Sequence, residues 1–364
     1  MPAVEYSASR MDLRNILRCP HHGCIVAEDR TAQVWRCKDG CTFQVVGEIP
    51  RFVPSQSYAS SFGLQWNEFE KTQLDSFTGT TISRDRLTRI VGGSPSVFID
   101  KLILEAGCGA GRFTEIMLSA GGQVFATDIS SAVEANRRNC GHLPGYFVCQ
   151  ADVRALPVAS DCFDVVICVG VIQHTPDPEE TISALCRYLK PGGLLLMDHY
   201  SPGYPESVSR RLLRTIMLQL SPRAALTFCR QLVTTLWPIH TAIWRLVRRF
   251  PRTRRLRSAF LLLSPVVDYH NAYMQLGADR LREWAILDTH DTLTDRYKHL
   301  RSSDQIAQHL RACGMIIVET TRAGNGVEVR AVKEAAESAT GSREGRSGIH
   351  PPHREKWPPS VKRG

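Results

Sequence analysis

Short apolar runs alternate with longer amphipathic stretches through the middle of the chain. Five of these runs are typical of buried strands, at 101–105, 123–127, 146–149, 163–169 and 194–198. The intervals between them are long enough to hold helices, as in a parallel sheet built from strand–helix–strand units. We therefore expect an α/β core with helices on both faces of the sheet.

A second pattern follows near the C-terminus. Residues 301–314 have the periodicity of an amphipathic helix, with Gly314 at its end. The runs 315–320 and 327–332 flank the turn residues 323–326, which predicts a β-hairpin. The helix and hairpin would complete a mostly parallel sheet of seven strands.

Changes in composition divide the 364 residues into six segments. We expect an N-terminal arm (1–16), a cysteine-bearing module (17–55), cap helices with the main core (56–200), a helical insertion (201–300), the final helix and strands (301–333) and a disordered tail (334–364).

The formal net charge of +9 is unevenly distributed. Residues 207–267 contain 12 Arg and no Lys, Asp or Glu. The rest of the chain, apart from the slightly basic tail, is net acidic. The basic character therefore belongs to the insertion rather than to the whole protein.

The compartment is suggested by what the chain lacks. Its first residues have no apolar stretch typical of a signal peptide, and no window of about 18 apolar residues predicts a membrane span. We expect a cytoplasmic protein, soluble or peripheral to the inner membrane surface. Most of its 12 Cys then act as small apolar residues in a reducing environment.

A glycine-rich loop is the strongest motif. Gly107, Gly109 and Gly111 directly follow a predicted strand and precede a predicted helix. Glycines at such a turn let the backbone approach a ligand closely. The carboxylate of Glu105 would repel a pyrophosphate beside this loop, and it suits a ligand that carries an ammonium group.

Two further carboxylates follow at strand ends. Asp128 can accept hydrogen bonds from two ribose hydroxyls, and Asp152 from an adenine amino group. Taken singly, each could instead cap a helix. Three acids at the ends of three successive strands favour a cofactor site in one crevice.

In this arrangement the chain resembles the class I S-adenosylmethionine-dependent methyltransferases, specifically the type 11, quinone-C-methylase-like group. Further matches are Ala155-Leu156-Pro157, Asp161–Val166, Gly170–His174 and Leu189–Gly193, in order over about residues 100–200. The resemblance implies a Rossmann-like fold and S-adenosylmethionine as cofactor. It also implies a set of cofactor-binding residues: Glu105, Ala106, Gly107, Cys108, Gly109, Gly111, Asp128, Ile129, Asp152, Val153 and Gly170.

Two features would lie on the acceptor side of such a cofactor. His174, after the strand at 163–169, is the best candidate for a general base, and its alternative role is to cap the turn at 176–179. The segment 58–75 resembles a helical cap, whose Phe62, Trp66 and Phe69 either shield the sulfonium or simply pack in the core.

The N-terminal module carries two cysteine pairs. Cys19 and Cys24 precede Cys37 and Cys41, and two such pairs can form a tetrahedral structural zinc site. The module resembles zinc ribbons fused to some methyltransferases, although their pairs are usually spaced by two residues. His21 or His22 could replace Cys24. Four apolar thiols, or a disulfide or redox role, are the alternatives.

The insertion at 207–267 allows three interpretations. Arginines beside apolar stripes suit a helix on an anionic membrane surface, a lid over an anionic acceptor, or a solvated basic face.

We expect in-line methyl transfer to a small-molecule or lipid-linked acceptor. The first alternative is an rRNA or tRNA base methyltransferase that uses the zinc ribbon to hold RNA. The near-neutral charge of the ribbon makes nucleic acid the less favoured partner. The second alternative is a non-catalytic protein that binds S-adenosylmethionine or a partner.

Overall fold

A seven-stranded sheet forms the centre of the protein. The computed structural model describes residues 12–54, 57–204, 206–324 and 326–335, and the chain up to Glu334 forms one compact unit. The strand order is β10-β11-β9-β8-β5-β6-β7. The strands are β5 (Leu102–Ala106), β6 (Gln123–Asp128), β7 (Tyr146–Gln150), β8 (Phe163–Cys168), β9 (Leu189–Tyr200), β10 (Met315–Ala323) and β11 (Gly326–Lys333).

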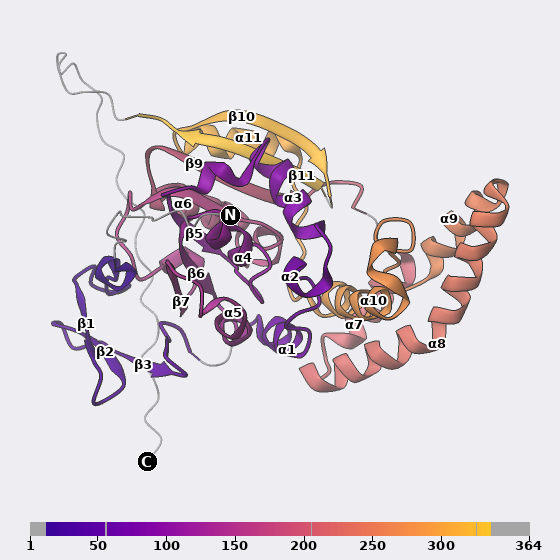
Figure 1. Cartoon of the computed structure of the whole chain (residues 1–364), viewed down its shortest axis with the longest axis horizontal. Helices are drawn as coiled ribbons and strands as arrows, with labels where there is room; N and C mark the ends of the chain where they lie inside the picture. The colour runs from indigo at the N-terminus through magenta and orange to yellow at the C-terminus, as the bar shows by residue number, and fades with distance from the viewer. Residues whose placement is uncertain (1–11, 55–56, 205, 325, 336–364) are drawn as a thin grey trace, which may run out of the picture. The chain divides into compact units, whose positions relative to one another are not determined.

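The pairing of these strands confirms the mostly parallel sheet. β5 to β9 pair in parallel, whereas β11 is antiparallel to both β9 and β10. In Figure 1, β10 and β11 lie beside β9. The expected hairpin is therefore present, and its turn residue Asn325 lies outside the described residues.

Helices cover both faces of the sheet, as expected. The helices around the sheet are α3 (Ile82–Val91), α4 (Thr114–Ser119), α5 (Ala132–Cys140), α6 (Pro178–Tyr188) and α11 (Ser303–Ala312). Successive residues of β5 enter different cores. Ile103 packs with residues of α3, α4 and α5, and Leu104 packs with residues of α6 and α11. This alternation is why the central strands have continuous apolar sequences.

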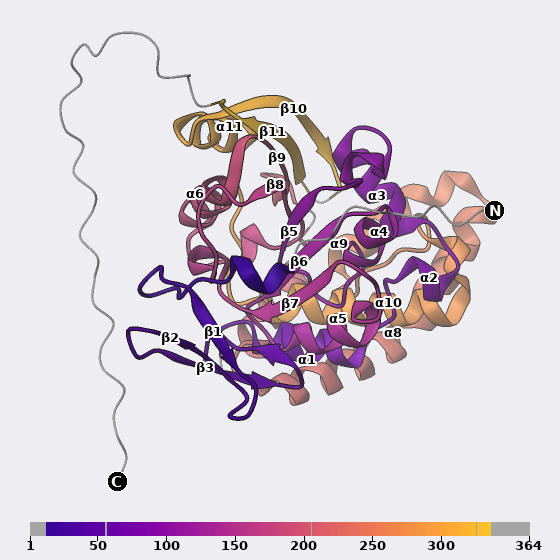
Figure 2. The ribbon, with the colours of Figure 1, turned by 60° about the vertical axis from the view of Figure 1, so that its left-hand side comes forward.

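The N-terminal module is a small antiparallel sheet. It follows η1 (Leu13–Ile16) and consists of β1 (Val26–Asp29), β2 (Val34–Cys37), β3 (Thr42–Val46) and β4 (Ile49–Pro50). Figure 2 shows β1, β2 and β3 on the β7 side of the main sheet. The backbone N–H of Phe52 donates to the carbonyl of Gln150 at 2.8 Å, so the module is fastened to the end of that edge strand.

Two helical regions complete the fold. The cap before the core contains α1 (Ser60–Glu68), α2 (Asp75–Thr78) and η2 (Pro95–Phe98). The insertion contains α7 (Val208–Met217), α8 (Pro222–Arg249), η5 (Pro251–Thr253), α9 (Arg254–Leu263), η6 (Met274–Leu276) and α10 (Gly277–Thr294). Two short turns, η3 (Val153–Ala155) and η4 (Ile172–His174), follow β7 and β8. None of the described helices is both long and apolar enough to span a membrane.

Candidate functional site

A cavity of about 980 Å³ lies where the parallel strands end. One wall comes from the segments after β5, β6, β7 and β8, and we call it the sheet wall. The opposite wall comes from α1, α3 and the insertion, and we call it the lid wall. The sheet wall contains most of the predicted cofactor residues: Gly107, Cys108, Gly109, Asp128, Ile129, Asp152, Val153 and Gly170.

The glycine loop has backbone conformations that favour glycine. Gly107, Gly109 and Gly111 have φ values of 78°, 50° and 100°. A Cβ added to Gly107 would lie 2.2 Å from the Val171 side chain. The N–H groups of Gly107 and Cys108 both donate to the carbonyl of Thr127, which ties the loop to the end of β6.

The carboxylate of Asp128 links the loop to the next strand. It accepts hydrogen bonds from the backbone N–H of Gly109 at 3.2 Å and from the N–H and hydroxyl of Ser130 at 2.9 and 2.7 Å. Burial raises the pKa of Asp128, and these hydrogen bonds oppose that rise. The group therefore lies in the cavity wall in a fixed orientation.

Asp152 has a different environment. It caps η3 by accepting from the N–H of Arg154, and the Arg154 guanidinium also contacts both of its carboxylate oxygens. Asp152 thus combines the capping role with a place in the cavity wall. Its charge is already neutralised by a neighbouring cation, unlike that of Asp128.

Three of the predicted cofactor residues lie behind the wall. Glu105, Ala106 and Gly111 are not among the residues that line the cavity. The Thr114 hydroxyl donates to the carboxylate of Glu105, and burial raises the pKa of Glu105 to about 8. Glu105 thus links the end of β5 to the first residue of α4, which follows the glycine loop.

His174 lines the cavity at the end of η4. Its Nδ1 lies 3.0 Å from the carbonyl oxygen of Tyr297 and 3.4 Å from a carboxylate oxygen of Asp295. A carbonyl only accepts hydrogen bonds, so Nδ1 carries the proton and Nε2 keeps a lone pair. Burial lowers the pKa of His174 to about 3. The following turn is capped by Asp177, not by His174.

The predicted cap aromatics divide into two groups. Phe62 and Trp66 line the cavity, and the Trp66 ring would contact a Cβ placed on Gly109 at 3.3 Å. Phe69 instead packs with Leu226 and Leu287. Only part of this segment is therefore positioned to shield a bound molecule from water.

The cavity is lined by two arginines that the sequence pattern did not assign, Arg86 in the lid wall and Arg112 in the sheet wall. Arg86 pairs with Asp198 at 2.6 Å, whereas Arg112 donates to Gln73. Arg112 immediately follows the glycine loop, and that position is the only sequence signal for it. Arg86 lies on α3, and nothing in its local sequence indicates a place in the cavity wall.

Two carboxylates of α10 also face the cavity. Asp288 accepts a hydrogen bond from the Trp284 indole at 3.1 Å, and burial raises the pKa of both Asp288 and Asp291. Both belong to the stretch 284–297, which contains several acidic, histidine and aromatic residues. The lid wall can therefore bind polar groups of a ligand as well as apolar surface.

A buried network of hydrogen bonds and ion pairs links α8 and α9 to the segment that follows α9. The carboxylate of Asp268 bonds to Nδ1 of His240 at 2.7 Å and to Nδ1 of His270 at 2.9 Å, and Arg257 lies 3.2 Å away. Nε2 of His240 lies 2.8 Å from the Ser264 hydroxyl. Burial opposes ionisation of Asp268, but the bonds to these histidines hold its pKa low. The network anchors the end of α9 to α8.

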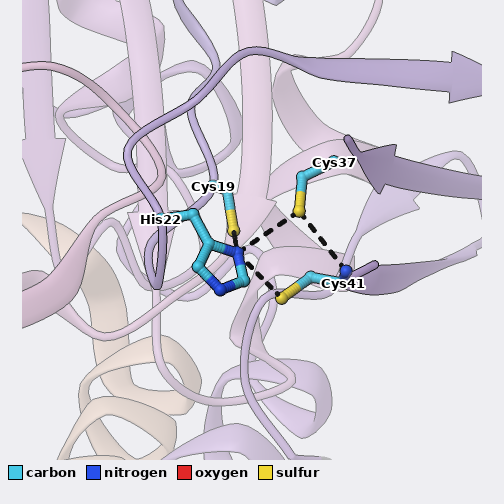
Figure 3. Close-up of side chains that lie close together, drawn as sticks. All are labelled: Cys19, His22, Cys37 and Cys41. Atoms are coloured by element: carbon cyan, nitrogen blue, oxygen red, sulfur yellow. Dashed lines mark hydrogen bonds between the residues drawn. The ribbon is translucent and has the colours of Figure 1, made fainter. Parts of the chain in front are cut away.

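A second group of polar side chains lies in the N-terminal module. Figure 3 shows Cys19, His22, Cys37 and Cys41 converging on one point. Their ligand atoms all lie within 4.8 Å of one another. Cys24, which the sequence pattern had placed in this set, instead lies near Cys37 and Asp39. His22 therefore occupies the position that had been expected for Cys24.

Comparisons with known proteins agree with this architecture. A family model described as "Methyltransferase domain" matches residues 104–197. Ubiquinone biosynthesis O-methyltransferase of Aromatoleum aromaticum is 29% identical over 127 residues, which cover 34% of this chain and 54% of that protein. The enzyme of that name from Pseudomonas paraeruginosa is 30% identical over 131 residues, covering 35% and 56%. The chain thus spans about half the length of these relatives.

Solved structures give a weaker likeness. Magnesium protoporphyrin IX methyltransferase from Synechocystis PCC 6803 with bound SAH is 15% identical. The alignment covers 76% of this chain and 97% of that one, with a TM-score of 0.40.

Proposed function

We propose that this protein transfers a methyl group from S-adenosylmethionine to a small-molecule or lipid-linked acceptor, because residues 104–197 match a family model described as "Methyltransferase domain". One observation carries the proposal. The glycine loop after β5 and the carboxylate of Asp128, the last residue of β6, line the same cavity at the carboxyl ends of parallel strands. Ligands of open α/β sheets bind at that edge.

The residues of the sheet wall fit the cofactor. Asp128, Asp152 and Val153 line the cavity. Asp128 would accept hydrogen bonds from the ribose hydroxyls, and Asp152 with Val153 would border the adenine. Arg112 forms no ion pair with a carboxylate among the described residues, so its buried charge suits the carboxylate of the methionine end. The backbone of five further lining residues would lie against the cofactor: Gly107, Cys108, Gly109, Ile129 and Gly170.

The cofactor would supply an activated methyl group on a sulfonium. The chain's own residues then have to orient the acceptor and exclude water, because the leaving group is already good. Phe62 and Trp66 form the apolar cover over this part of the cavity. Nε2 of His174 has the free lone pair needed to accept a proton from an acceptor hydroxyl.

The cavity favours a small or amphiphilic acceptor. Its volume is at the upper end of the range for small-molecule sites, about 300–1,000 Å³. The relatives named as ubiquinone biosynthesis O-methyltransferases make an aromatic hydroxyl a suitable first choice. Asp288 and Asp291 can accept hydrogen bonds from further polar groups of such a molecule.

The lid offers a route for a lipid-linked acceptor. Six arginines between Arg245 and Arg255 form no ion pair with a carboxylate among the residues that the structure describes: Arg245, Arg248, Arg249, Arg252, Arg254 and Arg255. Leu262 and Leu263 of α9 are 66% and 71% exposed, and Leu262 also lines the cavity. Cations beside exposed leucines suit peripheral contact with an anionic membrane.

The same observations weigh against RNA as the acceptor. RNA binding requires cations, but it does not call for exposed leucines beside them. Moreover, two arginines of the N-terminal module are paired, Arg30 with Glu28 and Arg36 with Asp29. The six arginines between Arg245 and Arg255 lie on the insertion, outside this module.

Calorimetric titration of the full chain with S-adenosylhomocysteine tests the cofactor site. Saturable binding is expected, followed by transfer of labelled methyl from S-adenosylmethionine to catechol-type acceptors presented free or in vesicles. Absence of binding would overturn the proposed function. Binding without transfer to any hydroxylated aromatic or lipid acceptor would instead favour the non-catalytic alternative.

A further inference from the structure

The cluster in the N-terminal module has an unusual arrangement around one nitrogen. Nδ1 of His22 lies 3.6 Å from the sulfur of Cys19, 3.5 Å from that of Cys37 and 3.5 Å from that of Cys41 (Figure 3). An imidazole nitrogen carries either one proton or one lone pair, so it can make only one of these contacts a proper hydrogen bond. Hydrogen bonding therefore does not explain why Nδ1 lies at nearly the same distance from all three sulfur atoms.

A tetrahedral zinc ion does explain them. Typical Zn–S and Zn–N distances are about 2.3 and 2.0–2.1 Å, and at tetrahedral angles they separate nitrogen from sulfur by about 3.5 Å. The three observed distances agree with this value. We propose that Cys19, His22, Cys37 and Cys41 bind one Zn²⁺ through three thiolates and Nδ1 of His22.

The backbone around the ligands is folded to present them. In the first turn, the N–H of Cys19 donates to the carbonyl of Cys24 at 2.7 Å, and Gly23 has φ of 69°. Cys24 therefore closes the turn through its backbone and leaves its thiol outside the cluster. In the second turn, the N–H of Cys41 donates to the sulfur of Cys37 at 3.3 Å, which stabilises a thiolate there.

The donor set makes this a structural site. Four protein ligands complete a tetrahedron, so no position remains for a water or substrate. The module needs such a link because a unit of about 35 residues buries little apolar surface on its own. Zinc would hold the turn before β1 and the turn before β3 together.

The position of the module connects this site to the cavity. Arg51 forms a bridge with Gln150 at the end of β7, and its guanidinium also donates to the Gln150 side chain at 3.0 Å. The next residues of the chain, Ala151 to Val153, line the cavity. The zinc-bound module thus supports the edge of the sheet wall from outside.

Metal analysis of the full chain, purified without a metal-affinity tag and after dialysis, tests the site. We expect about one zinc per chain in the wild type. The variants His22→Ala and Cys41→Ala should lose most of it. The matched controls His21→Ala and Cys24→Ser should keep it, because neither side chain belongs to the set.

A further variant distinguishes loss of a zinc ligand from unfolding of the module. His22→Cys restores a fourth ligand and should keep zinc, which a merely unfolded module would not. Cobalt substitution should give thiolate charge-transfer absorption that is stronger in His22→Cys than in the wild type. Wild-type protein without zinc, or loss of zinc from Cys24→Ser with retention in His22→Ala, would overturn the proposed site. None of these readouts depends on methyl transfer.

Discussion

The two walls of the cavity are formed by different kinds of segment, so we expect substitutions in them to have different effects. The sheet wall comes from turns that directly follow β5, β6, β7 and β8, so each of its side chains is placed by the end of a strand. The lid wall comes from α1, α3 and the insertion, which are distant in sequence. In the proposed function, the sheet wall would bind the cofactor, and the lid wall would distinguish the acceptor.

This difference also explains which residues of the cavity could be predicted from the sequence. The glycine loop and Asp128 could be predicted because a strand end fixes both, and local spacing carries the information. Arg86 could not, because its place in the wall depends on how α3 packs against the sheet. His22 replaced Cys24 for a similar reason. The Cys24 sulfur lies near Cys37 and Asp39 instead of in the set around His22, and residue spacing alone does not show this.

The largest expected effect is on membrane binding, which should depend on arginines of the insertion and not on the sheet wall. Changing Arg248, Arg249, Arg254 and Arg255 to Ser removes four exposed cations. Each cation near an anionic surface contributes about 1 kcal/mol, so partition into phosphatidylglycerol vesicles should fall about 1,000-fold. Vesicle flotation measures this fall, and calorimetry should find the affinity for S-adenosylhomocysteine unchanged.

Two comparisons make that experiment specific. Arg30→Ser with Arg36→Ser, in the N-terminal module, should leave flotation as in the wild type. Wild-type protein should also fail to float with purely zwitterionic vesicles. Equal flotation of the four-arginine variant and the wild type would remove the membrane from the proposed function. Salt-sensitive RNA binding lost in the same variant would support the RNA alternative.

The next effect belongs to the sheet wall. Asp128→Ala removes the carboxylate that, in the proposed function, accepts hydrogen bonds from the ribose hydroxyls, and hydrogen bonds to charged groups contribute about 1.5–3 kcal/mol each. The dissociation constant for S-adenosylhomocysteine, measured by calorimetry, should therefore rise at least about 100-fold. Asp152→Ala should weaken binding less, because Arg154 already neutralises that carboxylate. An equal loss in both variants would contradict the distinction between the two acids.

A smaller effect, on kcat, is expected for His174, which lines the cavity at the end of η4. Its low pKa makes it a weak base, so the contribution to kcat should be near the lower limit for general bases, about 100-fold. His174→Asn should lower kcat by that factor and leave cofactor affinity unchanged, with His299→Asn as the matched control. An unchanged kcat in His174→Asn would exclude the histidine as a base.

The pH dependence gives an independent check on His174. Burial lowers its pKa to about 3, so the neutral imidazole is present throughout the range from pH 5 to 8. The rate should therefore show no acid limb near 6.5, the ordinary pKa of histidine. A limb at that pH which disappears in His174→Asn would show that the side chain is more hydrated than its buried position implies.

The smallest expected effect compares Glu105, a buried acid behind the sheet wall, with Asp291 of the lid wall. Burial raises the pKa of Glu105 to about 8, so between about pH 4.5 and 8 the folded protein holds a proton that the unfolded chain releases. The free energy of unfolding must then decrease as the pH rises through this window. Glu105→Gln cannot ionise, and its melting temperature should fall less between pH 5.5 and 8 than that of the wild type.

Asp291→Asn makes the corresponding change in the lid wall, because burial also raises the pKa of Asp291. If both acids are held protonated by the fold alone, each variant should flatten the pH dependence of the melting temperature. Binding of a cofactor with an ammonium group should reduce the slope only where the acid becomes ionised next to it, because the ammonium lowers the pKa of that acid toward its unfolded value. Glu105 is the acid beneath the glycine loop, so we expect this response to S-adenosylhomocysteine to disappear in Glu105→Gln and to persist in Asp291→Asn. The reverse result would place the methionine end of the cofactor against the lid wall.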